Sequence, residues 1–217
     1  MGEVMKVLEL FAGSRSFSKV AEEMGMETYT TDREPFKDID QVCDIFDFDL
    51  DKMDEEFGVP NIIWASPPCT FFSVASIGHH WNKDHTPKTE QAILGMKIVE
   101  ETKWIIKMLN PKWFYIENPR GKLRKLSVMT CEPFFRKTIS YCSYGDDRMK
   151  PTDIWTNDFN WIPRQICFNG NKNCHHQPAP RGSQTGTQGL KGNYERSKVP
   201  NELCREILRS IIDESPK

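Results

Sequence analysis

Hydrophobic and polar positions in the first part of the chain follow first a strand pattern and then a helix pattern. Residues 4–11 alternate and then become continuously apolar, as in a buried strand. After a turn of small residues, positions 17–24 carry apolar side chains at helical spacing, and residues 27–31 again resemble a strand. Strand, helix and strand followed by Asp32 predict a βαβ unit, whose strand ends bind nucleoside-bearing ligands.

The same kind of pattern continues to the end of the chain. It predicts four further strands, at residues 61–65, 112–116, 137–142 and 153–156. It also predicts two further helices, at residues 86–110 and 200–212. Strands that alternate with helices predict an α/β fold with a mostly parallel sheet and helices on both faces. Residues 157–198 show no clear period and are too many for a plain connection, so we expect this segment to be functional or mobile.

Composition narrows the class of protein. A chain of 217 residues that is 38% hydrophobic and 28% charged fits one globular domain with its own core. Its apolar runs are far shorter than the roughly 20 residues that cross a bilayer, and its first residues lack the pattern of a signal peptide. Seven scattered cysteines favour a reducing compartment. We therefore expect a cytoplasmic protein that does not bind membranes.

Charge is distributed unevenly along the chain. Residues 1–64 carry 6 Lys and Arg against 16 Asp and Glu, whereas residues 65–217 carry 23 against 15. The stretches 120–137 and 164–198 each hold six basic residues and one acidic residue. This asymmetry favours one surface that binds a polyanion, although ordinary solvated charge would give the same counts.

Three polar clusters follow predicted strands, at residues 13–16, 67–69 and 117–119. Because parallel strands end at one edge of a sheet, we expect the three clusters to meet in a single cleft. Cys69 follows two prolines that fix its backbone, and a thiolate in such a place is a candidate nucleophile. A small buried hydrophobic role is the alternative for a free cysteine.

The motifs in these clusters resemble those of the DNA (cytosine-5) methyltransferases, and more closely a compact, phage-like member with a short target-recognition region. Residues 8–13 match the opening cofactor motif, and Pro67-Pro68-Cys69 with Phe72-Ser73 matches the nucleophile motif. Glu117-Asn118 matches the catalytic pair. The resemblance spans residues 5–156 and resumes weakly at 196–212. It implies the Rossmann-like fold of S-adenosylmethionine-dependent methyltransferases.

The resemblance also implies a reaction, the transfer of a methyl group from S-adenosylmethionine to carbon 5 of cytosine in DNA. In this family a cysteine thiolate adds to a base that has been flipped out of the duplex. The catalytic residues implied here are Cys69, Glu117, Asn118, Arg148 and Lys150. The implied cofactor-binding residues are Phe11, Ala12, Gly13, Ser14, Arg15, Ser16, Phe17, Asp32, Arg33, Asp44, Ile45 and Pro67.

The family has a separate target-recognition region, for which residues 157–198 are available here. The catalytic domain would then comprise residues 1–156 and 199–217. So short a segment implies a recognition sequence of about two to four base pairs. We expect a monomer acting on double-stranded DNA in a bacterial or phage-infected cell. The expected DNA-contacting residues are Ser73, His79, His80, Lys83, Arg120, Arg164, Lys172, Arg181, Gln184 and Lys191; for the histidines an exposed polar loop is an equal alternative.

Cysteine and histidine residues in the same segment raise the question of a metal. Cys167 and Cys174-His175-His176 could bind zinc and stiffen the segment. The gap of six residues between the two cysteines is wider than the two to four of common zinc motifs. The sequence alone therefore predicts no metal site.

Three positions depart from the family pattern. Arg15 stands where a second glycine is usual, so its side chain is expected to restrict the turn and crowd the methionine end of the cofactor. Lys150 replaces an arginine, which turns a forked contact into a point charge. Pro119 replaces the usual valine.

Three other functions are compatible with parts of the pattern. Ser66 to Cys69 differs by one residue from the motif of methyltransferases that act on exocyclic amines, but these enzymes need an aromatic ring and no thiol. Arg15 would suit a methyltransferase-like DNA-binding protein with weak or no catalysis. A tRNA cytosine-5 methyltransferase would share the catalytic residues, and a comparison of DNA and tRNA as methyl acceptors would distinguish it.

Overall fold

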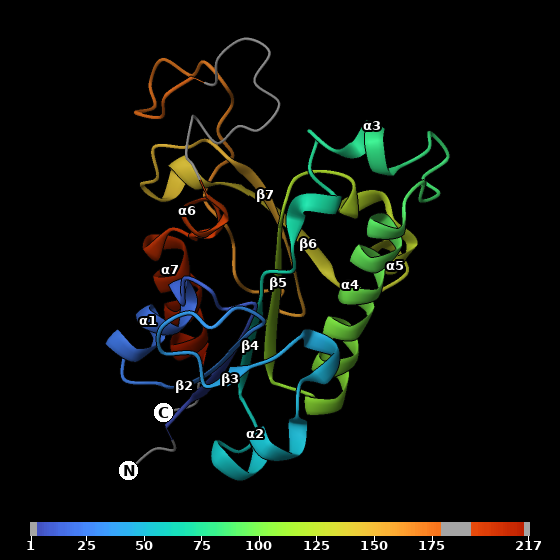
Figure 1. The fold of residues 1–217 in the computed structure, drawn as a ribbon. Helices are drawn as coiled ribbons and strands as arrows, with labels where there is room; N and C mark the ends of the chain where they lie inside the picture. Colours follow the sequence, from blue (N-terminus) through green and yellow to red (C-terminus); the bar gives the residue numbers. More distant parts are fainter. Residues whose placement is uncertain (1–3, 179–191, 215–217) are drawn as a thin grey trace.

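A seven-stranded sheet forms the centre of the molecule, in the strand order β3-β2-β1-β4-β5-β7-β6 (Figure 1). The computed structural model describes residues 4–178 and 192–214. The first five strands are parallel, and β7 runs antiparallel to both of its neighbours. The strands are β1 (Lys6–Leu10), β2 (Glu27–Asp32), β3 (Gln41–Val42), β4 (Ile62–Ala65), β5 (Trp113–Pro119), β6 (Phe135–Ser140) and β7 (Pro151–Thr156). The predicted α/β fold with a mostly parallel sheet is confirmed.

Helices cover both faces of this sheet. Helices α1 (Ser16–Glu23) and α7 (Asn201–Glu214) lie against one face, and α4 (Glu90–Leu109) and α5 (Ser127–Thr130) against the other (Figure 1). The shorter helices are α2 (Leu50–Glu56), α3 (Ile77–His80) and α6 (Asn193–Ser197), with 3-10 turns η1 (Ile45–Asp47), η2 (Cys69–Phe71), η3 (Leu123–Lys125) and η4 (Tyr141–Tyr144). Within the described ranges, no helix has the length and apolar character needed to span a membrane.

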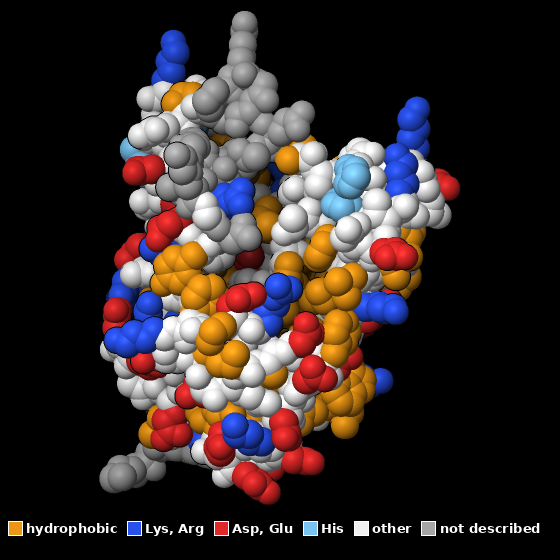
Figure 2. All heavy atoms as spheres, viewed as in Figure 1, with side chains coloured by type: hydrophobic (Ala, Val, Ile, Leu, Met, Phe, Trp, Pro, Cys, Tyr) orange, Lys and Arg blue, Asp and Glu red, His pale blue; other side chains and the backbone are white. Residues whose placement is uncertain are grey.

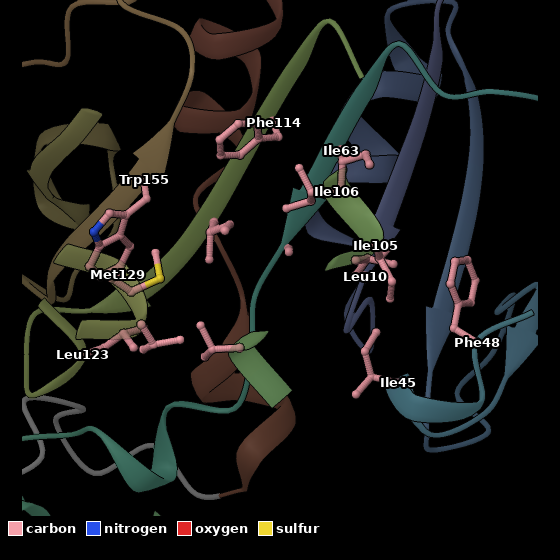
Figure 3. Packing of buried hydrophobic residues seen from close by; sticks show 14 of the residues in the cluster. Leu10, Ile45, Phe48, Ile63, Ile105, Ile106, Phe114, Leu123, Met129 and Trp155 are labelled. Atoms are coloured by element: carbon pink, nitrogen blue, oxygen red, sulfur yellow. The ribbon is translucent and has the colours of Figure 1, made fainter. Parts of the chain in front are cut away.

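The period-two alternation of the strands divides the core into two clusters. Leu10 and Ile63 point toward α4, where they pack with Ile105 and Ile106 (Figure 3). The alternate residues point toward α1 and α7, and there Trp64 stacks on Phe17 at 4.6 Å between ring centroids. Each fully buried side chain of this size contributes about 1.5–3 kcal/mol. The sheet is thus held rigidly from both faces.

Helix α4 begins later than the sequence suggested. Thr86 was the expected start, but its hydroxyl bonds Asp84 within a turn, and residue 87 pairs with Trp81 in a short bridge. The N-cap is Thr89, whose side chain accepts a hydrogen bond from the Ala92 amide. The pairing with Trp81 keeps the preceding residues extended, which a local reading of capping residues does not detect.

Strand β5 is longer than predicted and includes two expected site residues. Glu117 and Asn118 were placed directly after the strand, but both lie within it and pair with Ile154 and Asp153 of β7. Their pairing partners, Ile154 and Asp153, lie 37 and 35 positions later in the sequence, so the local pattern could not indicate this pairing. Both side chains therefore stand on a strand with neighbours on either side.

Candidate active site

The register of the parallel strands brings the three predicted clusters to one edge of the sheet. Leu10 of β1 is the neighbour of Ala65 in β4, and Ala65 is the neighbour of Ile116 in β5. The residues that follow these three positions therefore lie side by side. Figure 2 shows a hollow in the molecular surface at this edge, between the regions of α6 and α3. This is the arrangement expected from parallel topology.

Cys69 opens the turn η2 directly after β4. Its carbonyl accepts hydrogen bonds from the amides of Phe72 and Ser73, which closes the turn. The carbonyl of Phe72 in turn accepts from the Lys122 amide at 2.7 Å. A Cβ on Gly121 would lie 2.2 Å from the same carbonyl oxygen, so only glycine fits there. The loop that carries Cys69 is therefore fixed against the loop that follows β5.

Glu117 is a buried carboxylate with two polar neighbours. The Tyr141 hydroxyl donates to its Oε1 at 2.8 Å, and the Lys150 ammonium lies 3.8 Å from the same oxygen. The Lys150 ammonium also lies 4.3 Å from the centroid of the Tyr141 ring. A buried carboxylate needs such partners, because an unpaired charge in the interior is costly. The three side chains together fix the position of the carboxyl group.

Asn118 connects β5 to Pro67, two residues before Cys69. Its Nδ2 donates to the carbonyl of Pro67 at 2.9 Å. Its Oδ1 is buried and has no hydrogen-bond partner among the described residues. Buried polar atoms are nearly always paired in a finished structure. This oxygen is therefore a free acceptor for a donor group on a ligand.

The charged neighbours of Cys69 affect its acidity in opposite directions. Burial raises the pKa of the Cys69 thiol above its ordinary value. Lys150 and, more weakly, Arg196 lower this pKa, because they stabilise the thiolate, whereas Glu117 raises it. The thiol, the carboxylate and the ammonium therefore act on one another within one site.

Arg148 lies close to this site but is engaged elsewhere. Its Nε and Nη2 donate to Asp146 at 2.8 and 2.5 Å, and the guanidinium also donates to the carbonyls of Glu195, Arg196 and Lys198. In the described part of the chain no hydrogen bond or ion pair joins it to Glu117. The structure therefore brings Lys150 to the Glu117 carboxylate, while Arg148 anchors the end of α6 and the residues after it.

The expected cofactor loop follows β1 in a constrained conformation. Phe11 has a φ of 61°, in the left-handed region. The amide of Gly13 donates to Asp32 Oδ2 at 2.9 Å, and a Cβ on Gly13 would lie 2.9 Å from the Phe36 ring. Asp32 also accepts from the Glu34 amide at 2.9 Å, and burial raises the pKa of its carboxyl. The loop is thus folded around this carboxylate at the end of β2.

Arg15 adopts the backbone conformation that glycine would supply. Its φ of 51° and ψ of 39° lie in the left-handed region, where a side chain costs about 1–2 kcal/mol. Its guanidinium forms an ion pair with Glu22, the second-last residue of α1. The turn that Arg15 was expected to restrict therefore forms at the cost of backbone strain. The Arg15 side chain is directed to Glu22 of α1 and does not extend over the cofactor loop.

The remaining predicted cofactor residues occupy different environments. Phe17 is fully buried in the core, so its ring cannot face a ligand, although its position was expected to contact the cofactor. Asp44 is exposed and caps η1, with Ile45 buried directly after it. Ser14 and Ser16 share a hydroxyl contact at 2.7 Å. The other members, Ala12, Arg33 and Pro67, lie at the ends of β1, β2 and β4.

The residues expected to contact DNA divide into exposed and engaged groups. His79, Lys83, Arg120 and Lys172 are exposed. His80 is buried instead, and its Nδ1 lies 2.7 Å from the Thr89 hydroxyl, so it braces the loop after Cys69 and does not face solvent. Ser73 is half-buried beside Ser76, at 3.0 Å.

Arg164 is also engaged within the molecule. It pairs with Glu206 at 2.6 Å and with Glu202 at 3.6 Å, both on α7. Its charge is therefore balanced by α7, and these ion pairs attach the segment after β7 to that helix. The other expected DNA contacts, Arg181, Gln184 and Lys191, lie outside the described residues.

Two residues of the site were not identified from the sequence. Glu9, in the middle of β1, is buried and accepts from the amides of Phe17 and Ser18, which fixes the start of α1. An acid within an otherwise apolar strand is the signal that could have indicated it. Tyr141, which holds Glu117, follows a weak strand, and no local pattern marks its partner.

Comparisons with known proteins agree with this arrangement. A model of the family described as C-5 cytosine-specific DNA methylase matches residues 5–134. A curated relative, the probable DNA (cytosine-5)-methyltransferase of Frog virus 3 (isolate Goorha), is 28% identical over 223 residues, which cover 94% of this chain and 99% of the relative.

One solved structure of low sequence identity shares the fold, and a second is less similar. A putative DNA modification methyltransferase encoded within an E. coli prophage has a TM-score of 0.51 and 13% identity, over 76% of this chain and 52% of that chain. A DNMT2 variant of Spodoptera frugiperda has a TM-score of 0.44 and 15% identity, over 75% of this chain and 56% of that chain. This chain therefore spans about half the length of the solved structures that it matches. The family model covers more than half of the chain, so this protein is a member of the C-5 cytosine-specific DNA methylase family, the enzymes that transfer a methyl group from S-adenosylmethionine to carbon 5 of cytosine in DNA.

Proposed function

We propose that this chain methylates cytosine at a short sequence in double-stranded DNA, with Cys69 as the nucleophile. The observation that supports this most strongly is the group formed by Cys69 after β4, Glu117 near the end of β5 and Lys150 directly before β7. A thiol that adds to an aromatic ring needs a nearby acid for the ring and a cation for its own thiolate. All three groups are present here.

The reaction begins with the Cys69 thiolate. Its sulfur forms a bond to carbon 6 of cytosine, and the electrons of the ring double bond make carbon 5 nucleophilic. Glu117 holds the proton at ring nitrogen 3 while negative charge develops on the base. After methyl transfer the proton at nitrogen 3 returns to Glu117 and solvent takes the proton on carbon 5. The electrons of that carbon–hydrogen bond re-form the ring double bond and expel the Cys69 thiolate, which restores the aromatic ring.

Three neighbours position these groups. Tyr141 orients Glu117 through its hydroxyl, and burial keeps the pKa of this phenol well above its ordinary value, so it remains a donor. Lys150 stabilises the thiolate and the charge that develops on the base. The free Oδ1 of Asn118 is suited to accept a hydrogen bond from the cytosine amino group.

The residues at the ends of β1, β2 and β3 fit S-adenosylmethionine. The Asp32 carboxylate, held by two backbone amides, is suited to the ribose hydroxyls. Asp44 and the apolar Ile45 are suited to the adenine ring. The Ala12 amide donates to the Thr31 carbonyl, which holds the loop from Phe11 to Gly13 against β2. When bound, this cofactor supplies an electrophilic methyl group.

DNA would bind across the hollow between the α3 loop and the segment after β7. A base within a duplex cannot reach Cys69, so it must be flipped out, at a cost of about a few kcal/mol. We assign residues 157–198 to target recognition and the rest of the chain to catalysis, although Arg148 attaches residues 195–198 to the catalytic part. All seven cysteines are free, which suits the reducing cytoplasm of a bacterial or phage-infected cell. We place the reaction in a monomer.

Methyl transfer from labelled S-adenosylmethionine tests the proposal. Duplex DNA of mixed sequence should be labelled, and tRNA should not. Cys69→Ser should reduce labelling by at least about 1000-fold. Cys131→Ser, which changes an exposed cysteine outside the group, should retain it. Labelling of tRNA alone would indicate the tRNA enzyme, and DNA binding without labelling would indicate a protein without catalysis.

A further inference from the structure

Four side chains with metal-binding atoms meet at the base of the segment that follows β7. They are Cys142, Cys167, Cys174 and His176, and their sulfur and nitrogen atoms all lie within 4.8 Å of one another. Cys142 comes from η4, and the other three come from a stretch of ten residues that begins 25 positions later. Neither the fold nor the proposed reaction uses these residues.

The convergence is held by hydrogen bonds between the two parts of the chain. The Cys167 amide donates to the Ser140 hydroxyl at 3.0 Å, and the Gln177 amide donates to the carbonyl of Asp147 at 3.1 Å. Asn171 Nδ2 donates to the Cys167 sulfur at 3.3 Å, a contact that would stabilise a thiolate. The four side chains are thus fixed by their surroundings and do not meet by chance at a flexible surface.

His176 indicates that the group is incomplete without a ligand. Its side chain is buried, with 4% of the residue exposed, and its Nε2 has no hydrogen-bond partner in the part of the chain described. Its Nδ1 lies 3.6 Å from the Cys167 sulfur. A buried imidazole needs partners, because a polar nitrogen without one costs free energy. An ion bound through Nδ1 would hold the ring in place and bring the three sulfur atoms together as ligands, and it would leave Nε2 as it is.

In its described residues, the segment also makes few of the apolar contacts that usually hold a chain in place. Four of its large hydrophobic side chains are between 48% and 83% exposed: Phe159, Ile162, Ile166 and Phe168. Trp161 is the large hydrophobic residue of this stretch that is buried. Short segments without a core generally need a metal or disulfide to fold. No disulfide is present, since all seven cysteines are free.

We propose that Cys142, Cys167, Cys174 and His176 bind one structural zinc ion. Three thiolates and one imidazole form a closed tetrahedral site of the kind that zinc prefers, with no position left for water. Ligand atoms around such an ion are about 3.5–3.8 Å apart, and the Cys167–His176 distance of 3.6 Å falls within this range. The wider pairs need side-chain movements of less than about 1 Å.

The zinc site would connect target recognition to catalysis. Cys142 directly follows Tyr141, whose hydroxyl holds the Glu117 carboxylate. A metal bound at Cys142 would therefore fix the turn that positions this tyrosine, and it would attach the segment after β7 to the same turn. The metal site itself does not depend on the proposed reaction, because its evidence is the ligand geometry alone.

Zinc content of the purified full-length protein tests the proposal. Protein produced with added zinc and purified without chelators should contain close to one zinc per chain by mass spectrometry of the element. Cys142→Ser and His176→Gln should each lower this ratio at least fivefold. The matched controls are His175→Gln, next to the cluster but outside it, and Cys131→Ser, and both should retain the metal. A ratio below about 0.1 in the reduced wild type, before and after addition of zinc, would overturn the proposal.

X-ray absorption at the zinc edge keeps the test valid if the variants fail to fold. The wild-type protein should show about three sulfur neighbours at 2.3 Å and one nitrogen neighbour at 2.0–2.1 Å. A zinc-specific chelator should also lower the melting temperature of the wild type. A first shell dominated by oxygen, or equal zinc content in all four variants, would contradict the site.

Discussion

At the scale of single residues, the activity depends on opposing charges around one thiol. Lys150 and Glu117 lie 3.8 Å apart, so each also moderates the effect of the other on Cys69. The net result is a pKa above the ordinary value, because burial outweighs the cations. The free enzyme would thus keep Cys69 protonated at neutral pH and form the thiolate as pH rises.

Removing the charge of Lys150 and removing that of Glu117 should change the rate of Cys69 alkylation in opposite directions. Lys150→Gln removes the cation that stabilises the thiolate, so the pKa of Cys69 should rise and its alkylation at fixed pH should slow about threefold to tenfold. Glu117→Gln removes the opposing charge and should accelerate alkylation. Iodoacetamide labelling followed by mass spectrometry from about pH 6 to 10 measures both effects, with exposed Cys131 as the internal reference. Shifts in the same direction for both variants would contradict this electrostatic arrangement.

Arg15 provides a test of backbone strain in the cofactor loop. Arg15→Gly and Arg15→Ala both remove the ion pair with Glu22, but only glycine relieves the left-handed conformation. The glycine variant should therefore be more stable than the alanine variant by about 1 kcal/mol. Urea unfolding of the two proteins measures this difference. Equal stability would mean that the turn relaxes without strain.

At the scale of elements, the loops after β4 and β5 act as one unit. The Phe72 carbonyl accepts from Lys122, and Trp81 donates from its indole nitrogen to the carbonyl of Phe71 at 2.7 Å. These contacts join η2, the α3 loop and the end of β5. The position of Cys69 relative to Glu117 is therefore set by loop packing as well as by strand register.

A methyl group at residue 121 should separate the two loops. Gly121→Ala would place Cβ 2.2 Å from the Phe72 carbonyl oxygen, so the backbone must move. We expect a loss of stability of about 1–3 kcal/mol and at least a tenfold loss of methyl transfer. Gly78→Ala is the matched control, because its Cβ would meet no atom within 4 Å. If both variants kept full activity, the loop contact would not matter for catalysis.

At the scale of the whole molecule, the two ends of the sheet differ in surface charge. In the view of Figure 2, acidic side chains gather toward α2, away from the hollow at the carboxyl edge. Exposed basic residues such as Lys83 and Arg120 lie on loops beside the site. This distribution matches the acidic first part and basic second part of the sequence. It would orient the molecule on a polyanion.

The salt dependence of DNA binding tests this orientation. Lys83→Gln combined with Arg120→Gln should weaken binding and reduce the slope of log affinity against log salt by about two. Lys52→Gln, on α2 at the acidic end, is the control and should leave the slope unchanged. Fluorescence anisotropy with duplex DNA over a series of salt concentrations gives both slopes. An equal effect of Lys52→Gln would indicate nonspecific attraction and no defined DNA face.

The features that local patterns determine could be predicted from the sequence. The features that depend on contacts between residues outside the local pattern could not. The unit from β1 to β2 and the three clusters at one edge follow from periodicity and parallel topology, and these are present in the structure. The burial of His80 depends on Thr89, nine residues away. The extension of β5 and the contact between Tyr141 and Glu117 depend on partners 24 or more residues away. Cys142 joins the cluster of possible metal ligands for the same reason, which spacing within residues 167–176 alone could not indicate.

The most direct test uses DNA that contains 5-fluorocytosine, incubated with the enzyme and S-adenosylmethionine. Fluorine cannot leave carbon 5 as a proton does, so the bond between Cys69 and carbon 6 should persist. Mass spectrometry should find a methylated adduct on the peptide that carries Cys69, and Cys69→Ser should form none. Methyl transfer to ordinary DNA without any adduct on the fluorinated DNA, or an adduct at another residue, would contradict the assignment of Cys69 as the nucleophile.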